Sequence, residues 1–198
     1  MLSYNESIKI LKDTKALLEG HFILSSGLHS DQYVQCARLL SYPKKSEIIC
    51  ASLTEKIKNN FNKIDIVLSP AIGGIVVGYE IGRQLNVQTI FAERDDGKLL
   101  LRRGFVIPQK FNVLIVEDVI TTGKSALECS KIVKINKANL VGFACIIDRS
   151  DNKTLIKEKI VSQIKIKIAI FKENELPDEL KKTPAVKPGS RNLSNDQN

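Results

Sequence analysis

The sequence predicts an α/β protein in which helices flank a mostly parallel sheet. Apolar runs typical of buried strands alternate along the chain with segments of helical periodicity, and this alternation is typical of a parallel sheet covered by helices. Polar or glycine-rich segments follow several of the runs directly. Because ligands bind at the carboxyl ends of parallel strands, the 198-residue chain is expected to form one ligand-binding domain.

The first helix is expected to open at a capping box. Ser3 and Glu6 have the required spacing, in which each side chain bonds to the backbone of the other residue. The helical pattern continues through Leu17 and Leu18, and Gly20 is expected to end it.

The remaining periodicity divides the chain into further elements. Helices are expected over residues 46–58, 74–85 and 126–135. Strands are expected over residues 64–69, 88–92, 112–116 and 140–147. Isoleucines at every second position from Ile164 to Ile170 predict one more strand with a solvated face. Residues 1–175 are therefore expected to form the folded domain, and residues 176–198 a polar C-terminal tail.

Composition and charge narrow the functional class. The formal net charge is +8, which suits a protein that binds phosphates or nucleic acid. The basic residues are spread along the chain and do not form one arm, so no nucleic-acid partner is expected. The hydrophobic content of 43% is ordinary for a globular protein. No apolar segment has the length of a secretory signal or a membrane span, so no membrane partner is expected.

The cysteines and histidines predict neither disulfides nor a metal centre. The cysteines show no paired spacing, and only two histidines accompany them, so no structural zinc site can be assembled and no protein metal site is expected. Reduced thiols are the simple interpretation, which favours the cytoplasm. The four cysteines are Cys36, Cys50, Cys129 and Cys145.

Residues 113–125 carry the most informative pattern in the chain. An apolar run leads into two adjacent carboxylates, Glu117 and Asp118, and a loop rich in hydroxyl groups then opens a helix. A helix N-terminus with free amides binds anions, and Gly123 lets the backbone approach a phosphate. Carboxylates suit the cis-diol of a ribose because they accept hydrogen bonds from its hydroxyls. The pattern predicts a ligand that carries both sugar hydroxyls and a phosphate.

This loop matches only part of a nucleoside-triphosphate loop. Gly123-Lys124-Ser125 coincides with the end of a Walker A loop, but Asp118 stands where the opening glycine belongs. A carboxylate at that position would repel a triphosphate. The alternative is an ordinary strand-to-helix turn with a capping Thr or Ser, which leaves the paired acids unexplained.

Two further segments have the composition of binding loops. Residues 69–74 follow a predicted strand and precede a helix, so their amides can wrap an anion; a tight turn is the alternative. Residues 94–98 are polar and lie between two strand-like runs, with Arg94 and Lys98 as candidate cations for a leaving group. A charged hairpin tip without a function is the alternative there.

Together these motifs resemble the type I phosphoribosyltransferases, and more narrowly the orotate phosphoribosyltransferases. Besides residues 113–125, the resemblance rests on residues 20–27, 69–78, 91–94, 101–105 and 148–149. It implies the type I phosphoribosyltransferase fold with a small N-terminal hood. It also implies transfer of a ribosyl 5-phosphate group from phosphoribosyl pyrophosphate to orotate, which gives orotidine 5′-monophosphate and pyrophosphate in pyrimidine biosynthesis.

The resemblance assigns roles to individual residues. Glu117 and Asp118 would hold the ribose hydroxyls and offset positive charge at the anomeric carbon, and Arg94 and Lys98 would complete the catalytic set. The residues expected to bind phosphoribosyl pyrophosphate are Ala71, Ile72, Gly73, Arg94, Lys98, Glu117, Asp118, Val119, Ile120, Thr121, Thr122, Gly123, Lys124 and Ser125.

Orotate would contact Thr121, Arg149 and Ser25, since a guanidinium takes a carboxylate with two parallel hydrogen bonds. Without the resemblance, Arg149 is equally well explained as a surface arginine paired with Asp148 or Asp151. The resemblance further implies Mg²⁺ held mainly through phosphoribosyl pyrophosphate. It implies a homodimer as well, in which the loop of residues 94–98 closes over the neighbouring subunit's site.

The chain departs from many members of the family at Ser25, Gly73 and Asp95, where lysine is common. Arg102 or Arg103 could supply missing charge near the third position. Two other functions remain open. One is transfer to a purine base, against which the arginine expected to hold a carboxylate argues. The other is a regulator that senses phosphoribosyl pyrophosphate and binds nucleic acid without catalysis.

Overall fold

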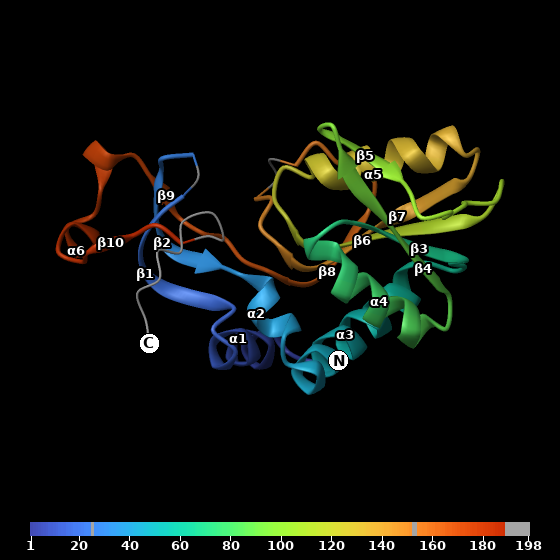
Figure 1. The fold of residues 1–198 in the computed structure, drawn as a ribbon. Helices are drawn as coiled ribbons and strands as arrows, with labels where there is room; N and C mark the ends of the chain where they lie inside the picture. The colour runs from blue at the N-terminus through green and yellow to red at the C-terminus, as the bar shows by residue number, and fades with distance from the viewer. Residues whose placement is uncertain (25, 152–153, 189–198) are drawn as a thin grey trace.

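Two sheets organise the computed structural model, which describes residues 1–24, 26–151 and 154–188. A six-stranded sheet has the strand order β5-β4-β3-β6-β7-β8, and a four-stranded sheet has the order β10-β1-β2-β9. The two sheets lie at opposite ends of the molecule, as Figure 1 shows. The predicted α/β class is confirmed, with a mostly parallel large sheet and a small second sheet built partly from the N-terminus.

The large sheet is parallel except at one edge, where β5 pairs antiparallel with β4. Its strands are β3 (Ile66–Pro70), β4 (Gln88–Asp95), β5 (Lys98–Leu101), β6 (Asn112–Ile120), β7 (Asn139–Asp148) and β8 (Ile160–Lys165). The main helices are α3 (Pro43–Asn60), α4 (Gly73–Leu85) and α5 (Lys124–Ile135). The helices and strands predicted between residues 46 and 147 are confirmed, with shifted ends.

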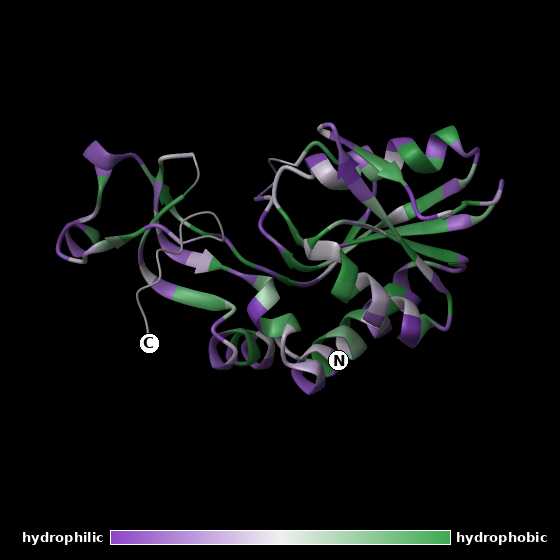
Figure 2. Cartoon of the chain, in the orientation of Figure 1, coloured by the Kyte–Doolittle hydropathy of each residue, from purple (hydrophilic) through white to green (hydrophobic). Residues whose placement is uncertain are grey.

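Both faces of the large sheet are covered, so its strands read as continuous apolar runs. Val67 and Leu114 pack with α3 and α4 in one buried cluster, whereas their neighbours Leu68 and Ile115 pack with α5 in the other. Figures 1 and 2 show the apolar strands between these helices. The polar residues that follow the parallel strands therefore gather on one side of the sheet, beyond the carboxyl ends of these strands.

The small sheet, which we call the hood, is built from strands that come from the first and the last parts of the chain. Its strands are β1 (Leu17–Ile23), β2 (His29–Val34), β9 (Ile170–Phe171) and β10 (Ala185–Val186). The shorter elements near it are α1 (Tyr4–Asp13), α2 (Cys36–Leu40), the 3-10 helix η1 (Glu173–Glu175) and α6 (Asp178–Lys181). Residues 178–186, which we call the C-terminal segment, thus belong to the hood. The proposed domain boundary at residue 175 stays a prediction.

The capping box at Ser3 and Glu6 is confirmed, but the predicted extent of the first helix is wrong. The helix ends at Asp13 because the Thr14 hydroxyl donates to the carbonyl of Ile10 at 2.8 Å and Lys15 turns to a φ of 54°. Leu17 and Leu18 form the start of β1, and Gly20 lies within that strand.

The single strand expected from Ile164 to Ile170 is also wrong. Strand β8 ends at Lys165, and Ile170 begins β9 in the hood. Ile164 and Ile166 are buried at 3% and 6% exposure, while Lys165 is exposed. The alternation of isoleucine with other residues indicates which side chains face the core. It continues through the segment that crosses from one sheet to the other, so it does not mark one continuous strand. In the described ranges, none of the helices has the length and apolar character needed to cross a bilayer.

Candidate active site

The two carboxylates of the central motif lie near the carboxyl end of β6. This strand runs to Ile120, beyond the predicted end, because its pairing with β7 continues from Glu117 opposite Cys145 to Ile120 opposite Asp148. Glu117 and Asp118 are both half-buried. The Asp118 Oδ1 accepts the backbone N–H of Val119 at 2.9 Å.

Burial makes both acids hard to ionise in the free protein. It raises the pKa of Glu117 to about 8, with a further contribution from the negative charge of Asp118. Burial also raises the pKa of Asp118, even though the hydrogen bond from Val119 lowers it. No basic side chain among the described residues offsets these effects. The pair is therefore suited to a ligand that brings hydrogen-bond donors or positive charge.

The loop between β6 and α5 presents free amides to an anion. Gly123 is the N-cap of α5 with a φ of 76° and has no side-chain cap, so the amides of the first turn lack helical partners. A Cβ atom on Gly123 would stand 2.7 Å from the Ile156 side chain and 2.9 Å from the Thr154 hydroxyl. Residue 123 must be glycine for both reasons, and Thr121 and Thr122 are left exposed beside the amides.

The loop after β3 approaches the acid pair. The Ala71–Ile72 peptide bond is cis, and α4 begins at Gly73 without a side-chain cap. A Cβ atom on Gly73 would lie 3.0 Å from each carboxylate oxygen of Asp118. The amides at the start of α4 and the β6 carboxylates thus face one shared space.

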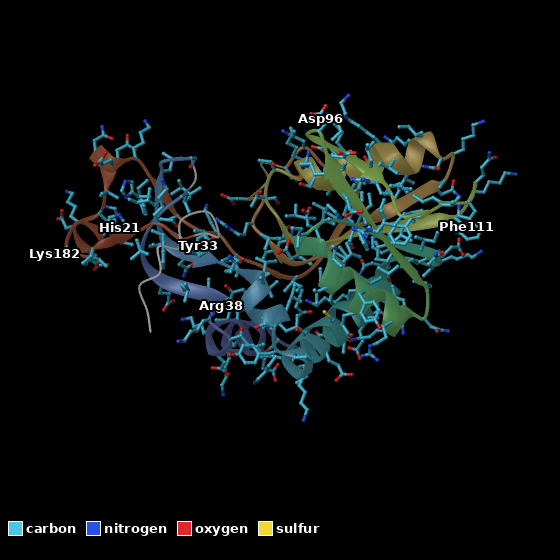
Figure 3. The ribbon with its side chains drawn as sticks, viewed as in Figure 1. His21, Tyr33, Arg38, Asp96, Phe111 and Lys182 are labelled. Atoms are coloured by element: carbon cyan, nitrogen blue, oxygen red, sulfur yellow. The ribbon has the colours of Figure 1, made fainter. Side chains whose placement is uncertain are left out.

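The segment expected to be a loop over residues 94–98 is a tight hairpin between β4 and β5. Asp95 pairs with Lys98, and Asp96 and Gly97 turn the chain with φ values of 45° and 77°, as in a two-residue type I′ turn. Figure 3 shows Asp96 at the tip of this hairpin. The hairpin is exposed, so its cations are not fixed by packing.

The arginines of the hairpin bind nearby acids. Arg94 Nη1 lies 3.1 Å from Glu128 Oε2 on α5. Arg94 therefore lies beside the helix that follows the loop of residues 121–123. Arg103 pairs with Glu93 at 2.7 Å, and Arg102 lies 3.7 Å from Asp95. Arg102 and Arg103 are therefore engaged within the hairpin and its flanks.

Arg149 follows β7 directly, and its backbone N–H bonds to the carbonyl of Ile120 at 2.8 Å. The alternative of a surface arginine paired with a neighbouring aspartate is wrong, because Asp148 pairs with Lys165 at 3.6 Å and Asp151 with Lys167 at 3.5 Å. In the described part of the chain, the Arg149 Nε is buried and has no hydrogen-bond partner. Burial lowers the pKa of this guanidinium. An anionic ligand would supply the missing acceptor.

Comparison with known proteins identifies the family. Residues 40–179 match the phosphoribosyl transferase domain family. The chain is 47% identical to an orotate phosphoribosyltransferase of Caldicellulosiruptor bescii over 184 residues, which cover 93% of this chain and 96% of that protein. The chain belongs to the orotate phosphoribosyltransferase family.

Solved structures support the fold without distinguishing the base. The crystal structure of an orotate phosphoribosyltransferase from Aeropyrum pernix superposes with a TM-score of 0.67 at 23% identity and covers 80% of this chain and 92% of that one. An adenine phosphoribosyltransferase from Thermoanaerobacter pseudethanolicus superposes with a TM-score of 0.60 at 17% identity, covering 68% of this chain and 88% of that one. The family assignment therefore rests on the sequence relatives.

Most of the expected site residues of this orotate phosphoribosyltransferase family member lie at or after the carboxyl ends of β3 and β6. They are the β6 acids, the loop between β6 and α5, and the loop at Ala71–Gly73. The Ile120 side chain is buried in the α5 cluster and Val119 packs on the opposite cluster, so both can offer only backbone groups to a ligand. Lys98 is exposed on the hairpin, and Ser25 lies outside the described residues.

Two residues near the expected site residues have no signal in the sequence. Glu128 holds Arg94, but its position on α5 resembles any polar helix position. Tyr33 on β2 lies close enough that its charge would raise the pKa of Arg149. Figure 3 shows Tyr33 on the hood. Its approach to Arg149 depends on how the hood docks on the large sheet, which local patterns cannot reveal.

Proposed function

We propose that the chain transfers the ribosyl 5-phosphate group of phosphoribosyl pyrophosphate to orotate in pyrimidine biosynthesis. The bond between the anomeric carbon and the pyrophosphate oxygen breaks, and a bond to the orotate ring nitrogen forms as that nitrogen loses its proton. The observation that carries the proposal is Arg149, whose buried Nε lacks a partner among the described residues. The carboxylate of orotate would accept a hydrogen bond from this nitrogen, and a purine base offers no such group.

In this reaction the acid pair acts on the ribose. Glu117 and Asp118 accept hydrogen bonds from the ribose hydroxyls, which favours their ionised forms. Once ionised, they stabilise the positive charge that develops at the anomeric carbon as pyrophosphate leaves. The amides from Gly123 onward and the hydroxyls of Thr121 and Thr122 hold the 5′-phosphate.

The pyrophosphate end is proposed to carry the metal. Within the described ranges, no group of three or more His, Cys, Asp and Glu side chains could hold an ion. Mg²⁺ prefers oxygen ligands while keeping several waters, so the diphosphate oxygens would supply most of its remaining ligands and the β6 carboxylates could add few. The ion would arrive on phosphoribosyl pyrophosphate and neutralise charge on the leaving group. Ala71, Ile72 and Gly73 would hold the pyrophosphate through their backbone.

We place the reaction in the cytoplasm and in a homodimer. All four cysteines are buried and unpaired, which suits a reducing compartment. Helix α4 and its N-cap carry an exposed apolar stripe of Ile72, Val76 and Tyr79, which are 86%, 49% and 65% exposed. A stripe of this kind supports docking of another protein. It begins at the proposed pyrophosphate loop, so a second copy seated on it could bring its own Lys98 to the leaving group.

A decisive assay follows the loss of ultraviolet absorbance as orotate is consumed in the presence of phosphoribosyl pyrophosphate and Mg²⁺. The same protein with adenine or hypoxanthine in place of orotate is the control. Turnover of orotate alone supports the proposal. Turnover of a purine, or binding of phosphoribosyl pyrophosphate without any turnover, contradicts it.

Subunit mixing tests the shared site. Lys98→Ala and Asp118→Asn are each expected to be nearly inactive. Heterodimers of the two contain one site with both lesions and one with neither, so activity should return to about a quarter of wild type after random assortment of a two-fold dimer. Subunit exchange observed by mass spectrometry without any recovered activity would place Lys98 in its own subunit's site or outside catalysis.

A further inference from the structure

The hood contains the only two histidines of the sequence, and they contact each other. His21 on β1 and His29 on β2 are 5% and 7% exposed. The His21 Nε2 lies 2.6 Å from the His29 Nδ1, and the His21 Nδ1 lies 2.9 Å from the carbonyl oxygen of Thr183. Figure 3 shows His21 beside the part of the chain that carries Lys182.

These contacts determine which ring nitrogens carry protons. The Thr183 carbonyl can only accept, so the His21 Nδ1 must donate to it. Neutral His21 then presents its Nε2 as an acceptor, and the His29 Nδ1 donates to it. One additional proton can be held on the His29 Nε2 without breaking either bond. A second would place two N–H groups face to face at the 2.6 Å contact, which breaks the pair.

The pair fastens the C-terminal segment to the hood. Strand β10 contributes only the register pairs His21–Ala185 and Phe22–Val186 with β1, and Leu180 buries one apolar side chain at 8% exposure. A two-residue strand forms little structure alone. The side-chain bond to Thr183 is therefore a substantial part of what holds this segment.

The charged groups around the pair are exposed and lie on every neighbouring element. In the described residues, none of them forms an ion pair or hydrogen bond with either imidazole. They are Glu19 on β1, Asp31 on β2, Lys172 after β9, Asp178, Glu179, Lys181 and Lys182 at α6, and Lys187 after β10. Lys181 is paired with Asp178 at 3.0 Å, and Glu19 with Lys12 at 2.7 Å. Solvent screens exposed charges of this kind.

We propose that His21 and His29 form an acid-sensitive latch that holds the C-terminal segment on the hood. The latched state holds at most one added proton, whereas two separated imidazoles hold two. Latching therefore weakens as pH falls, by up to about tenfold per pH unit for one proton of difference.

Hydrogen exchange measured on the whole chain tests the latch directly. Protection factors of the backbone amides in residues 178–186 are compared between about pH 7.5 and pH 5, a range that spans ordinary histidine titration. Residues 113–116 in β6 are the internal control. We expect wild-type protection in the C-terminal segment to fall toward acid while β6 protection does not fall. Unchanged protection of the C-terminal segment across this range would overturn the proposal.

Two variants distinguish the effect of the His21–Thr183 hydrogen bond from the effect of protonating the imidazoles. In His29→Asn, the side-chain amide can still donate to His21 but cannot titrate, so protection should stay high at acidic pH. In His21→Leu, the bond to Thr183 is lost, so protection should be low at every pH. Acid loss in His29→Asn equal to that of wild type, or wild-type protection in His21→Leu, would contradict the latch.

Discussion

The carboxyl end of β6 and the hairpin between β4 and β5 carry the expected acidic and basic site residues, and they differ in how firmly these side chains are held. Glu117 and Asp118 are half-buried on a strand that pairs on both sides, with glycine backbone packed close to them. Arg94 and Lys98 are exposed on a two-stranded excursion. In the proposed reaction, the part of the site that would bind the ribose and the phosphate is therefore preorganised within one chain. The cations proposed for the leaving group are exposed and are not fixed by packing.

The largest effect should come from the preorganised region. We expect Asp118→Asn to lower kcat by about a hundredfold, roughly 3 kcal/mol, because a neutral amide cannot offset charge at the anomeric carbon. Steady-state assays with both substrates measure it. Exposed Asp13 at the end of α1 provides a matched Asp→Asn control. Near-normal turnover of the Asp118 variant would remove this carboxylate from the mechanism.

The next effect concerns the base. Arg149→Ala should weaken orotate binding by about 2–3 kcal/mol through loss of a charge-assisted pair, with much less effect on phosphoribosyl pyrophosphate. Calorimetric titration of each substrate measures the difference, and Lys165→Ala serves as a control because it removes an exposed cation from the neighbouring Asp148. Equal weakening of both substrates would mean that Arg149 supports the fold or the phosphate site.

The pH dependence of the free energy of unfolding should distinguish Glu117 on β6 from Lys98 on the hairpin. An unfolded Glu117 loses its proton near 4.5, whereas the folded one keeps it until about pH 8. Between these values the native state binds more protons than the unfolded state, so stability should fall as pH rises. Urea midpoints of the free protein at several pH values measure this. Glu117→Gln should flatten the decline, whereas Lys98→Ala on the exposed hairpin should leave it unchanged. A wild-type decline retained by Glu117→Gln would contradict the assignment.

The sequence predicts the carboxyl end of β6 better than it predicts the contacts of the hairpin, for a physical reason. The acid pair, the phosphate loop and the capping box at Ser3 are set by residues close together in the chain, so local patterns reveal them. Leu17 and Leu18 are apolar in either a helix or a strand, and Thr14 decides between them. The contacts of Arg94 with Glu128 and of His21 with Thr183 join distant segments, and no local periodicity encodes them.

The smallest effect should come from the exposed pair that holds the hairpin. Arg94 and Glu128 have side chains that are 43% and 21% exposed, and an ion pair this accessible stabilises a fold by no more than about 1 kcal/mol. Glu128→Gln should therefore shift the urea midpoint only slightly. It should also lower the KM for phosphoribosyl pyrophosphate, because Arg94 no longer has to leave a carboxylate to reach the pyrophosphate. Glu47→Gln, which loosens the exposed Arg83 pair on the α3–α4 surface, controls for the loss of a surface charge. A raised KM in Glu128→Gln would show that Glu128 aims Arg94 at the substrate, in which case the hairpin is as preorganised as the carboxyl end of β6.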